Sequence, residues 1–171
     1  MSVNLISLKT FDLKKKQIFE IIKLKNSHWK TGLKKQLEWF RKNIKKDDIH
    51  NIIYLNRKMI GYNCLRNRKF KINKNYKSYL LFDTIVIQKR FRSRQFGKKF
   101  MELNNGIINK KKKISILLCT SSKVNFYKKN NWKILNLKKK ILVTFNHKKK
   151  LVMIYNKKIF PKKDYSNIIF N

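Results

Sequence analysis

The 171-residue chain contains no alanine and has one proline, four glycines, two cysteines and eight acidic residues. Two cysteines cannot build a disulfide framework, so we expect a reducing, cytoplasmic environment. No segment approaches the roughly 20 consecutive apolar residues needed to cross a bilayer, which predicts a protein without a membrane span. The N-terminus lacks a basic start followed by an apolar run, so no signal peptide is predicted.

What is present is enough to build a core. Hydrophobic residues make up 42% of the chain and aromatic residues 13%, which excludes a disordered basic tail as a description of the whole. The length suits one domain, and the sequence shows neither an internal repeat nor a linker. We therefore expect a single domain over residues 1–160, followed by a C-terminal tail over 161–171.

The charge is strongly one-sided: 45 Lys and Arg against eight Asp and Glu give a formal net charge of +37. The absence of alanine, the abundance of Lys, Asn and Ile, and the presence of only seven Arg are typical of codon drift in an AT-rich genome. Drift accounts less well for the scarcity of acidic residues, because a domain of this size ordinarily carries roughly 20. The sequence favours drift and leaves a selected surface for polyanions as the alternative.

Apolar periodicity predicts alternating strands and helices, hence an α/β protein with a mixed sheet. Asp12 is the expected N-cap of the first helix, and the polar residues 67–77 are expected to form a loop. Strands are predicted over residues 3–8, 52–55, 59–65, 79–87 and 114–119, with two more inside 132–155. Helices are predicted over residues 13–25, 33–44, 96–107 and 121–130.

The junction between the most apolar strand, 79–87, and the helix that begins at Phe96 is the most informative segment. Free N–H groups and the dipole at the start of a helix stabilise an anion there. Gly97 allows the backbone to approach a bulky phosphate closely. The basic side chains around this point are Arg92, Arg94, Lys98 and Lys99. The segment therefore predicts a binding site for a diphosphate.

This segment resembles the acetyl-CoA motif of the GNAT superfamily of N-acetyltransferases. In that motif an Arg or Gln is followed by two residues, a Gly, one residue and a Gly or Ala at the opening of a helix. Arg92-Ser93-Arg94-Gln95-Phe96-Gly97 follows the pattern, five residues after the strand residue Ile87. Gln95 stands where the first glycine is usual, and it is expected to weaken coenzyme binding if this position needs a positive φ.

A second segment extends the resemblance. Phe126-Tyr127-Lys128-Lys129-Asn130-Asn131-Trp132 is similar to a Phe-Tyr-x-x-x-Gly-Phe helix of the same superfamily. Thr120 stands where many members have an Asn that contacts the coenzyme arm. The resemblance implies a largely antiparallel sheet of six to seven strands, with helices on both faces and a splay between the central strands.

The resemblance also implies direct transfer of the acetyl group from acetyl-CoA, as cosubstrate, to a primary amine, without a metal. Tyr127 matches the residue that protonates the departing thiolate. Asp83 is the candidate base or substrate anchor, and it shares strand parity with Ile85 and Ile87, so we expect these three side chains on one face. The expected coenzyme contacts are Ile85, Val86, Ile87, Arg92, Ser93, Arg94, Gln95, Phe96, Gly97, Lys98 and Thr120.

Each of these residues also has a purely structural interpretation. Tyr127 could be an aromatic core residue, and Asp83 could bond a neighbouring backbone group or a lysine. Cys119 is expected to be a small buried hydrophobe. The three histidines have no metal-ligand spacing, so no metal site is predicted. Trp29 and Trp39 are expected on different helical faces, one of them packing the core.

The function that these observations predict is an N-acetyltransferase acting on a small amine acceptor. The positive field disfavours cationic acceptors and favours an anionic or sugar-linked amine. The alternative is a basic module of the same fold that binds nucleic acid or the ribosome and lacks catalysis, with aromatic residues between Phe70 and Tyr79 available for stacking. The sequence leaves open whether the protein forms a homodimer.

Overall fold

A computed structural model of the chain describes residues 2–72, 75–92, 95–135, 141–143, 151–156 and 168–170. The α-helices are α1 (Lys15–Trp29), α2 (Leu33–Asn43), α3 (Phe96–Lys110) and α4 (Val124–Lys128), and the 3-10 turns are η1 (Thr10–Asp12), η2 (Lys89–Phe91) and η3 (Ser121–Lys123). Within these ranges no helix combines the length and the apolar character that a membrane crossing requires.

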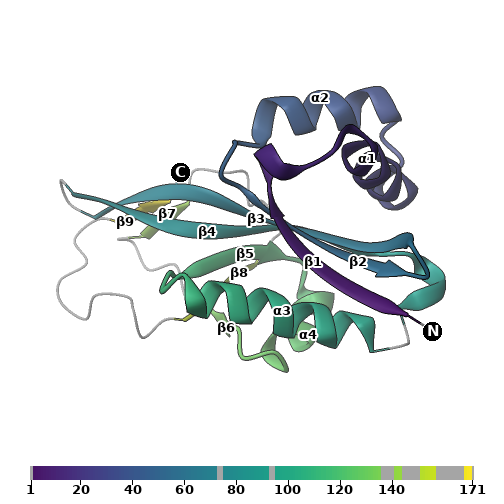
Figure 1. Ribbon diagram of the computed structural model, residues 1–171. Helices are drawn as coiled ribbons and strands as arrows, with labels where there is room; N and C mark the ends of the chain where they lie inside the picture. Colours follow the sequence, from purple (N-terminus) through teal and green to yellow (C-terminus); the bar gives the residue numbers. More distant parts are fainter. Residues whose placement is uncertain are drawn as a thin grey trace. The chain divides into compact units, whose positions relative to one another are not determined.

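The strands are β1 (Val3–Lys9), β2 (Ile49–Leu55), β3 (Lys58–Ile72), β4 (Asn75–Ile87), β5 (Ser115–Cys119), β6 (Lys133–Ile134), β7 (Ile141–Val143), β8 (Leu151–Tyr155) and β9 (Ile168–Phe170). Hydrogen-bonded neighbours follow the order β1-β2-β3-β4-β5-β8-β6, with β9 beside β3 and β7 beside β9 (Figure 1). The sheet is mixed and mostly antiparallel, with β4–β5 and β7–β9 as parallel pairs. The fold class expected from the sequence is confirmed.

The chain divides into two compact units, and β3, β4 and α3 run through both. Unit 1 comprises residues 1–66 and 82–104, and unit 2 comprises residues 67–81 and 105–171. The parallel register of β4 with β5 consists of Leu80↔Ser115 and Leu81↔Ile116, all in unit 2. Beyond Leu81, β4 passes into unit 1.

Unit 1 has a hydrophobic cluster on each face of its strands. Alternate residues of one strand serve opposite clusters: Ile52 packs with residues of α1 and α2, whereas Ile53 packs with Phe96 and Phe100 of α3. The same alternation places Val86 on the α1–α2 side. In Figure 1 the two helices lie on one side of these strands and α3 on the other. The central strand β2 is therefore buried on both faces, whereas the edge strand β1 is largely exposed.

Unit 2 is built around an apolar cluster of its own. Its members come from both ends of the unit's sequence and are Phe70, Tyr79, Ile114, Ile116, Leu135, Val152 and Ile154. Trp132 is fully buried behind α4, and its indole N–H donates to Asn105 on α3 at 3.1 Å. This bond ties the end of the α4 segment to the second half of α3.

The structure corrects two expectations about elements. Residues 67–77 were expected to be a loop, yet most of them extend β3 and β4. The extension depends on the distant strand β9, because Phe70 pairs with Phe170 in register and Phe70 is buried. Asp12 is not the N-cap of α1: it lies in η1, and Lys14 precedes the helix with its N–H donating to Gln17.

The strands predicted over residues 52–55 and 59–65 form a hairpin, with a two-residue turn at Asn56 and Arg57, whose φ angles are 47° and 64°. Positive φ at both turn residues is typical of the tight turn that matches strand twist. Residues 144–150, which lie between the two strands expected inside 132–155, are outside the described ranges.

Candidate functional site

A break in the regular geometry of β4 defines the first part of the site. Thr84, in the middle of the strand, has a φ of 57°, which is rare for a β-branched residue. The break changes the alternation of side chains: Ile85 and Ile87 pack on the α3 side, while Asp83 meets Arg66 on the α1–α2 side. The expectation that these three share one face is therefore wrong, because the irregularity at Thr84 lies between them.

A buried amide network supports this break. The side chain of Asn63 on β3 donates to the main-chain carbonyl of Asp83 at 3.2 Å. Asn51 on β2 in turn donates to Asn63 at 3.4 Å and to Asn104 on α3 at 2.7 Å. All three Asn side chains are fully buried. An unpaired buried carbonyl would cost about 1–3 kcal/mol, so Asn63 stabilises the irregular strand geometry at Asp83.

The Asp83 carboxylate is engaged at both oxygens. Arg66 on β3 donates to Oδ2 at 2.8 Å, and the Thr84 hydroxyl donates to Oδ1 at 3.2 Å. Arg66 also donates to the main-chain carbonyl of Asn43 at the end of α2 at 3.0 Å, and its guanidinium lies over the Trp39 ring at 5.4 Å. The partner of Asp83 is therefore an arginine, where the structural interpretation of the sequence had a backbone group or a lysine.

Two more ionisable groups are buried on this side of unit 1. Lys25 on α1 places its Nζ 3.6 Å from the centroid of the Trp39 ring. Burial lowers the pKa of Lys25 from 10.5 to about 8, against the opposing effect of Asp83. Burial, and then the Lys25 charge, lower the pKa of His50 from 6.5 to about 4. Neutral His50 is held by Tyr62 at 2.8 Å and Thr10 at 2.9 Å.

The second part of the site is the junction that leads from β4 into α3. Gln95 has a φ of 58°, and its carbonyl accepts the N–H of Lys99 at 3.1 Å, so it immediately precedes the helix. Phe91 and Phe96, one on each side of the loop, pack edge to face at 6.2 Å inside the cluster under α3. Gln95, which stands where the motif has its first glycine, therefore has a left-handed backbone.

The basic side chains expected around the junction differ in their contacts and exposure. Arg92 turns back onto the strand: its Nε donates to the carbonyl of Ile87 at 3.0 Å and its Nη2 lies 2.9 Å from Nδ1 of His28. Lys98 and Lys99 are exposed, and Lys98 is 4.0 Å from Glu102 one helical turn away. Ser93 and Arg94 lie outside the described residues.

Three further residues singled out in the sequence belong to unit 2. Tyr127 on α4 is buried, and burial, followed by the nearby Cys119, raises the pKa of its phenol well above the ordinary value. Thr120 is exposed and begins η3, with its hydroxyl 3.0 Å from that of Ser122. Cys119 is buried at the end of β5 as expected, and burial raises the pKa of its thiol.

The two tryptophans differ in burial, and one of them packs against the core as predicted. Trp39 packs against the cluster under α1 and α2, whereas Trp29 remains 43% exposed at the end of α1. Among the described residues, no group of three or more His, Cys, Asp or Glu side chains is placed to hold a metal ion.

Sequence reasoning missed Arg66, Asn63 and the irregular strand at Thr84. Arg66 offered a weak signal as one of only seven arginines. Thr84 offered none, because a β-branched residue inside an apolar run predicts regular strand.

Solved structures with the same fold are N-acyltransferases and proteins related to them in structure. ElaA from Escherichia coli superposes with a TM-score of 0.68 at 12% identity, covering 91% of this chain and all of that one. An acyl-CoA N-acyltransferase from Pseudomonas aeruginosa gives 0.67 at 12% identity, covering 90% of this chain and 99% of that one. The PaiA N-acetyltransferase from Thermoplasma acidophilum, in complex with coenzyme A, gives 0.59 at 17% identity, covering 90% and 98%.

The chain has the GNAT fold. This agrees with the architecture that the two sequence motifs implied. No protein-family model and no curated protein matches the sequence. With identities of 12% and 17%, the three structures show a shared fold, and the chemistry has to be argued from the residues of this chain.

Proposed function

We propose that the protein is an acetyl-CoA-dependent N-acetyltransferase that acetylates the primary amine of a small acceptor. The observation that carries the proposal is the left-handed backbone of Gln95 (φ 58°) directly before α3. In the superfamily motif this position is a glycine, the residue that adopts such a backbone without strain. The chain has this backbone geometry although glutamine does not favour it, which supports a loop shaped like that of the motif.

The start of α3 fits the diphosphate of coenzyme A. The first intrahelical bond runs from Lys99 to Gln95, so the preceding N–H groups of Phe96, Gly97 and Lys98 belong to the unpaired first turn. Such amides together with the helix dipole bind phosphate well, and the exposed Lys98 and Lys99 add positive charge. Arg92 contributes by fixing the loop to the Ile87 carbonyl rather than as a free charge.

The strand before the loop would receive the pantetheine arm, with main-chain groups of Ile85, Val86 and Ile87 as its partners and Thr120 as a further contact. Acetyl-CoA supplies an activated thioester. The irregularity at Thr84 interrupts the regular direction of main-chain groups just before these residues. We assign to Asn63 the task of holding this geometry through the Asp83 carbonyl.

Transfer requires a neutral amine, loss of one proton from the attacking nitrogen, and one proton or strong hydrogen bond for the departing thiolate. Tyr127 is assigned the second task. The phenol is protonated at neutral pH, which is the form that can donate, and burial raises its pKa, which makes it a weaker acid. Asp83 is assigned to the acceptor amine, as anchor or base, and the Arg66 contact holds its carboxylate in one orientation. The net charge of +37 supports an anionic or sugar-linked acceptor over a cationic one.

Calorimetric titration of the intact protein with acetyl-CoA and with CoA tests the coenzyme site. Gly97→Asp places a carboxylate in the first turn of α3 and is expected to abolish binding by repelling the diphosphate. The matched control is Gly106→Asp in the same helix, where an added Cβ meets no atom within 4 Å. If the unaltered protein binds neither acetyl-CoA nor CoA, the proposed function is wrong.

Tyr127→Phe tests the proton donor. Removing the phenol oxygen is expected to slow turnover by about 10²–10⁴-fold at unchanged coenzyme affinity. Tyr155→Phe is the control, because that hydroxyl accepts a bond from Asn109 and has no assigned part in the reaction. An unchanged turnover number in Tyr127→Phe would assign Tyr127 to the core alone.

A further inference from the structure

The part of β3 and β4 that was expected to be a loop forms a strand pair in unit 2, over residues 67–72 and 75–81, which we call the ribbon. Its β3 strand also pairs with β9 and its β4 strand with β5. One face of this ribbon is buried, with Phe70 and Tyr79 edge to face at 6.0 Å in the apolar cluster of unit 2. Side chains alternate along a strand, so the opposite face carries Lys69 and Lys71 from β3 and Tyr76 from β4. We call these three residues the ribbon face.

Packing in the hydrophobic core does not account for Tyr76 on the ribbon face. Its side chain is 61% exposed, although burying a tyrosine is ordinarily favourable. The Nζ of Lys71 lies 5.9 Å from the centroid of the Tyr76 ring, so a cation borders the exposed ring. Lys69 is exposed as well. An exposed ring beside two lysines combines a stacking surface with phosphate-binding charge.

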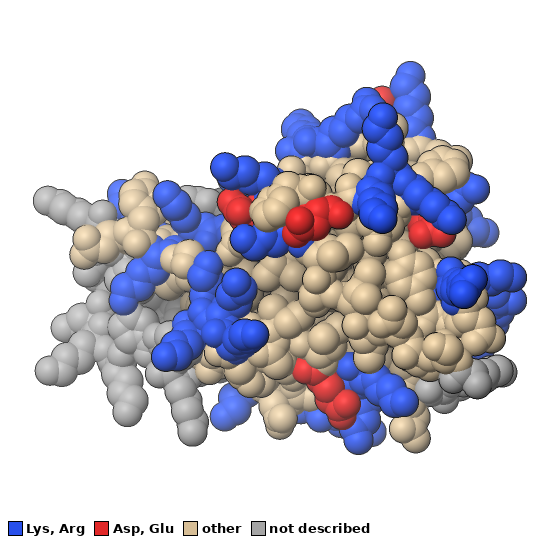
Figure 2. Space-filling model, in the orientation of Figure 1, with Lys and Arg blue, Asp and Glu red and all other residues tan. Residues whose placement is uncertain are grey.

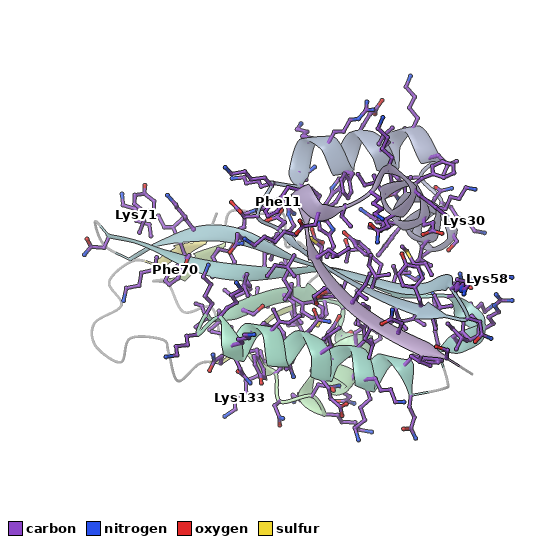
Figure 3. The ribbon with its side chains drawn as sticks, viewed as in Figure 1. Phe11, Lys30, Lys58, Phe70, Lys71 and Lys133 are labelled. Atoms are coloured by element: carbon purple, nitrogen blue, oxygen red, sulfur yellow. The ribbon has the colours of Figure 1, made fainter. Side chains whose placement is uncertain are left out.

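The surroundings of the ribbon face are basic. Lys113 donates from its Nζ to Asn67 on β3 at 2.9 Å, which brings the run Lys110–Lys113 at the end of α3 beside the ribbon. Burial and the neighbouring Lys111 lower the pKa of Lys113, as expected where cations crowd together. In Figure 2 blue side chains gather at the left end of the view, and Figure 3 places Lys71 and Phe70 there.

The described part of unit 2 carries no acidic residue. Seven of the eight acidic residues of the chain belong to unit 1. The positive charge of the described ribbon face therefore has no described carboxylate of unit 2 to offset it.

We propose that the ribbon face binds single-stranded nucleic acid, with a base stacked on Tyr76 and phosphates held by Lys69 and Lys71. A single exposed ring on a strand can stack only with a base whose face is free, which is the case in a single strand and not inside a duplex. The neighbouring cations follow the backbone of the strand. The site lies in unit 2 and does not use the coenzyme loop, so it stands independently of the proposed acetyl transfer.

The ring is tested by fluorescence anisotropy of the full chain with labelled 12-nucleotide single strands of RNA and of DNA. Tyr76→Ala is expected to weaken binding about 5- to 100-fold, the range for losing one stacked base. Tyr76→Phe keeps the stacking surface and is expected to retain the affinity. Inorganic polyphosphate has charge but no bases, so its binding should be equal in all three proteins. A difference between the RNA and DNA strands identifies which of the two the face prefers.

The charges are tested by the salt dependence of the same binding. The double variant Lys69→Gln, Lys71→Gln is expected to reduce the slope of log affinity against log salt concentration by about 1.4, since each phosphate contact contributes about 0.7 for a single strand. The control is the double variant Lys15→Gln, Lys16→Gln, which removes the same charge from exposed positions on α1 in unit 1. Its slope should remain that of the unaltered protein.

Three results would overturn the proposal. The first is an affinity for single strands that does not change in Tyr76→Ala. The second is an equal loss of slope in both lysine double variants, which would mean general attraction by the whole charged surface. The third is binding to vesicles that contain phosphatidylserine without binding to either oligonucleotide, which would assign the surface to a membrane.

Discussion

Unit 1 and unit 2 differ in what they bury. Unit 1 buries charged, imidazole and amide side chains, whereas the buried side chains with polar atoms in the described part of unit 2 are Ser115, Cys119 and aromatic residues such as Tyr127 and Trp132. Ser115 is satisfied locally, by donating to the carbonyl of Leu80 at 2.7 Å. The buried polar residues of unit 1 are Lys25, Gln36, Asp48, His50, Asn51, Asn63 and Asn104.

This difference is informative because burying polar groups costs stability unless each is paired. Unit 1 retains these groups around Asp83 and the irregular strand at Thr84, where we assign acceptor binding. Unit 2 keeps its interior apolar and carries its polarity on the surface as uncompensated positive charge. The buried polar groups of unit 1 accompany Asp83, to which we assign the acceptor, whereas the assigned proton donor, Tyr127, is buried in unit 2.

Two acidic residues of unit 1 have defined structural partners. Asp83 pairs with Arg66, and Asp48 accepts the N–H of Lys45 at 2.9 Å. A carboxylate with a partner has a structural reason to resist replacement. The described residues of unit 2 contain no such pairs because they contain no carboxylates.

The largest effect on the free energy of unfolding is expected from a substitution in the apolar interior of unit 2. Trp132→Ala removes a side chain that is 1% exposed and its bond to Asn105, and we expect the free energy of unfolding to fall by about 3–5 kcal/mol. Denaturant unfolding followed by circular dichroism measures it. Trp29→Ala, at a 43% exposed position in unit 1, is the control and should cost far less. Equal losses in both variants would contradict the assignment of Trp132 to the core.

A somewhat smaller effect on the free energy of unfolding is expected when His50, in the polar interior of unit 1, becomes protonated. The pKa of folded His50, about 4, lies below the 6.5 of the unfolded chain, so stability is fully present above pH 6.5 and is lost as the pH falls toward 4. The shift corresponds to about 3 kcal/mol over that window. Urea unfolding between pH 7 and pH 4 measures it.

The matched variant for this window is His50→Gln, which cannot titrate. The difference in unfolding free energy between the unaltered protein and His50→Gln should shrink as the pH falls from 6.5 to 4, because only the unaltered protein loses the contribution of His50. Parallel pH profiles for the two proteins would show that the buried imidazole does not titrate in this range.

The fold was largely predictable because its signals are local. The periodic apolar residues of α2 and α3, and the apolar run of β4, identify elements without knowledge of their partners. The extension of β3 and β4 was not predictable in this way, because residues 67–72 are mostly polar and the last three of them pair with β9, about a hundred residues later in the chain.

The sequence predicted the loop of the candidate site, before α3, but not the geometry of the strand β4. A motif of fixed spacing singled out the junction at Gln95, where the structure has a positive φ. The side on which Asp83 lies depended on Thr84, whose backbone is set by the buried carboxamide of Asn63 and not by any local preference of threonine. The rule that alternate residues of a strand share one face fails where a long-range bond holds the strand in an irregular geometry.

The smallest effect concerns the junction itself and separates backbone strain from side-chain chemistry. Gln95→Gly relieves the left-handed strain, which is about 1–2 kcal/mol, but increases the freedom of the unfolded chain by about 0.5–1 kcal/mol. We expect a net gain of about 0.5–1 kcal/mol in stability, and a two- to fivefold gain in CoA affinity because the loop is held in its binding geometry. Gln95→Ala keeps the strain and should gain neither. An equal gain in affinity for Ala and Gly would mean that the glutamine side chain, rather than its backbone, limits access to the start of α3.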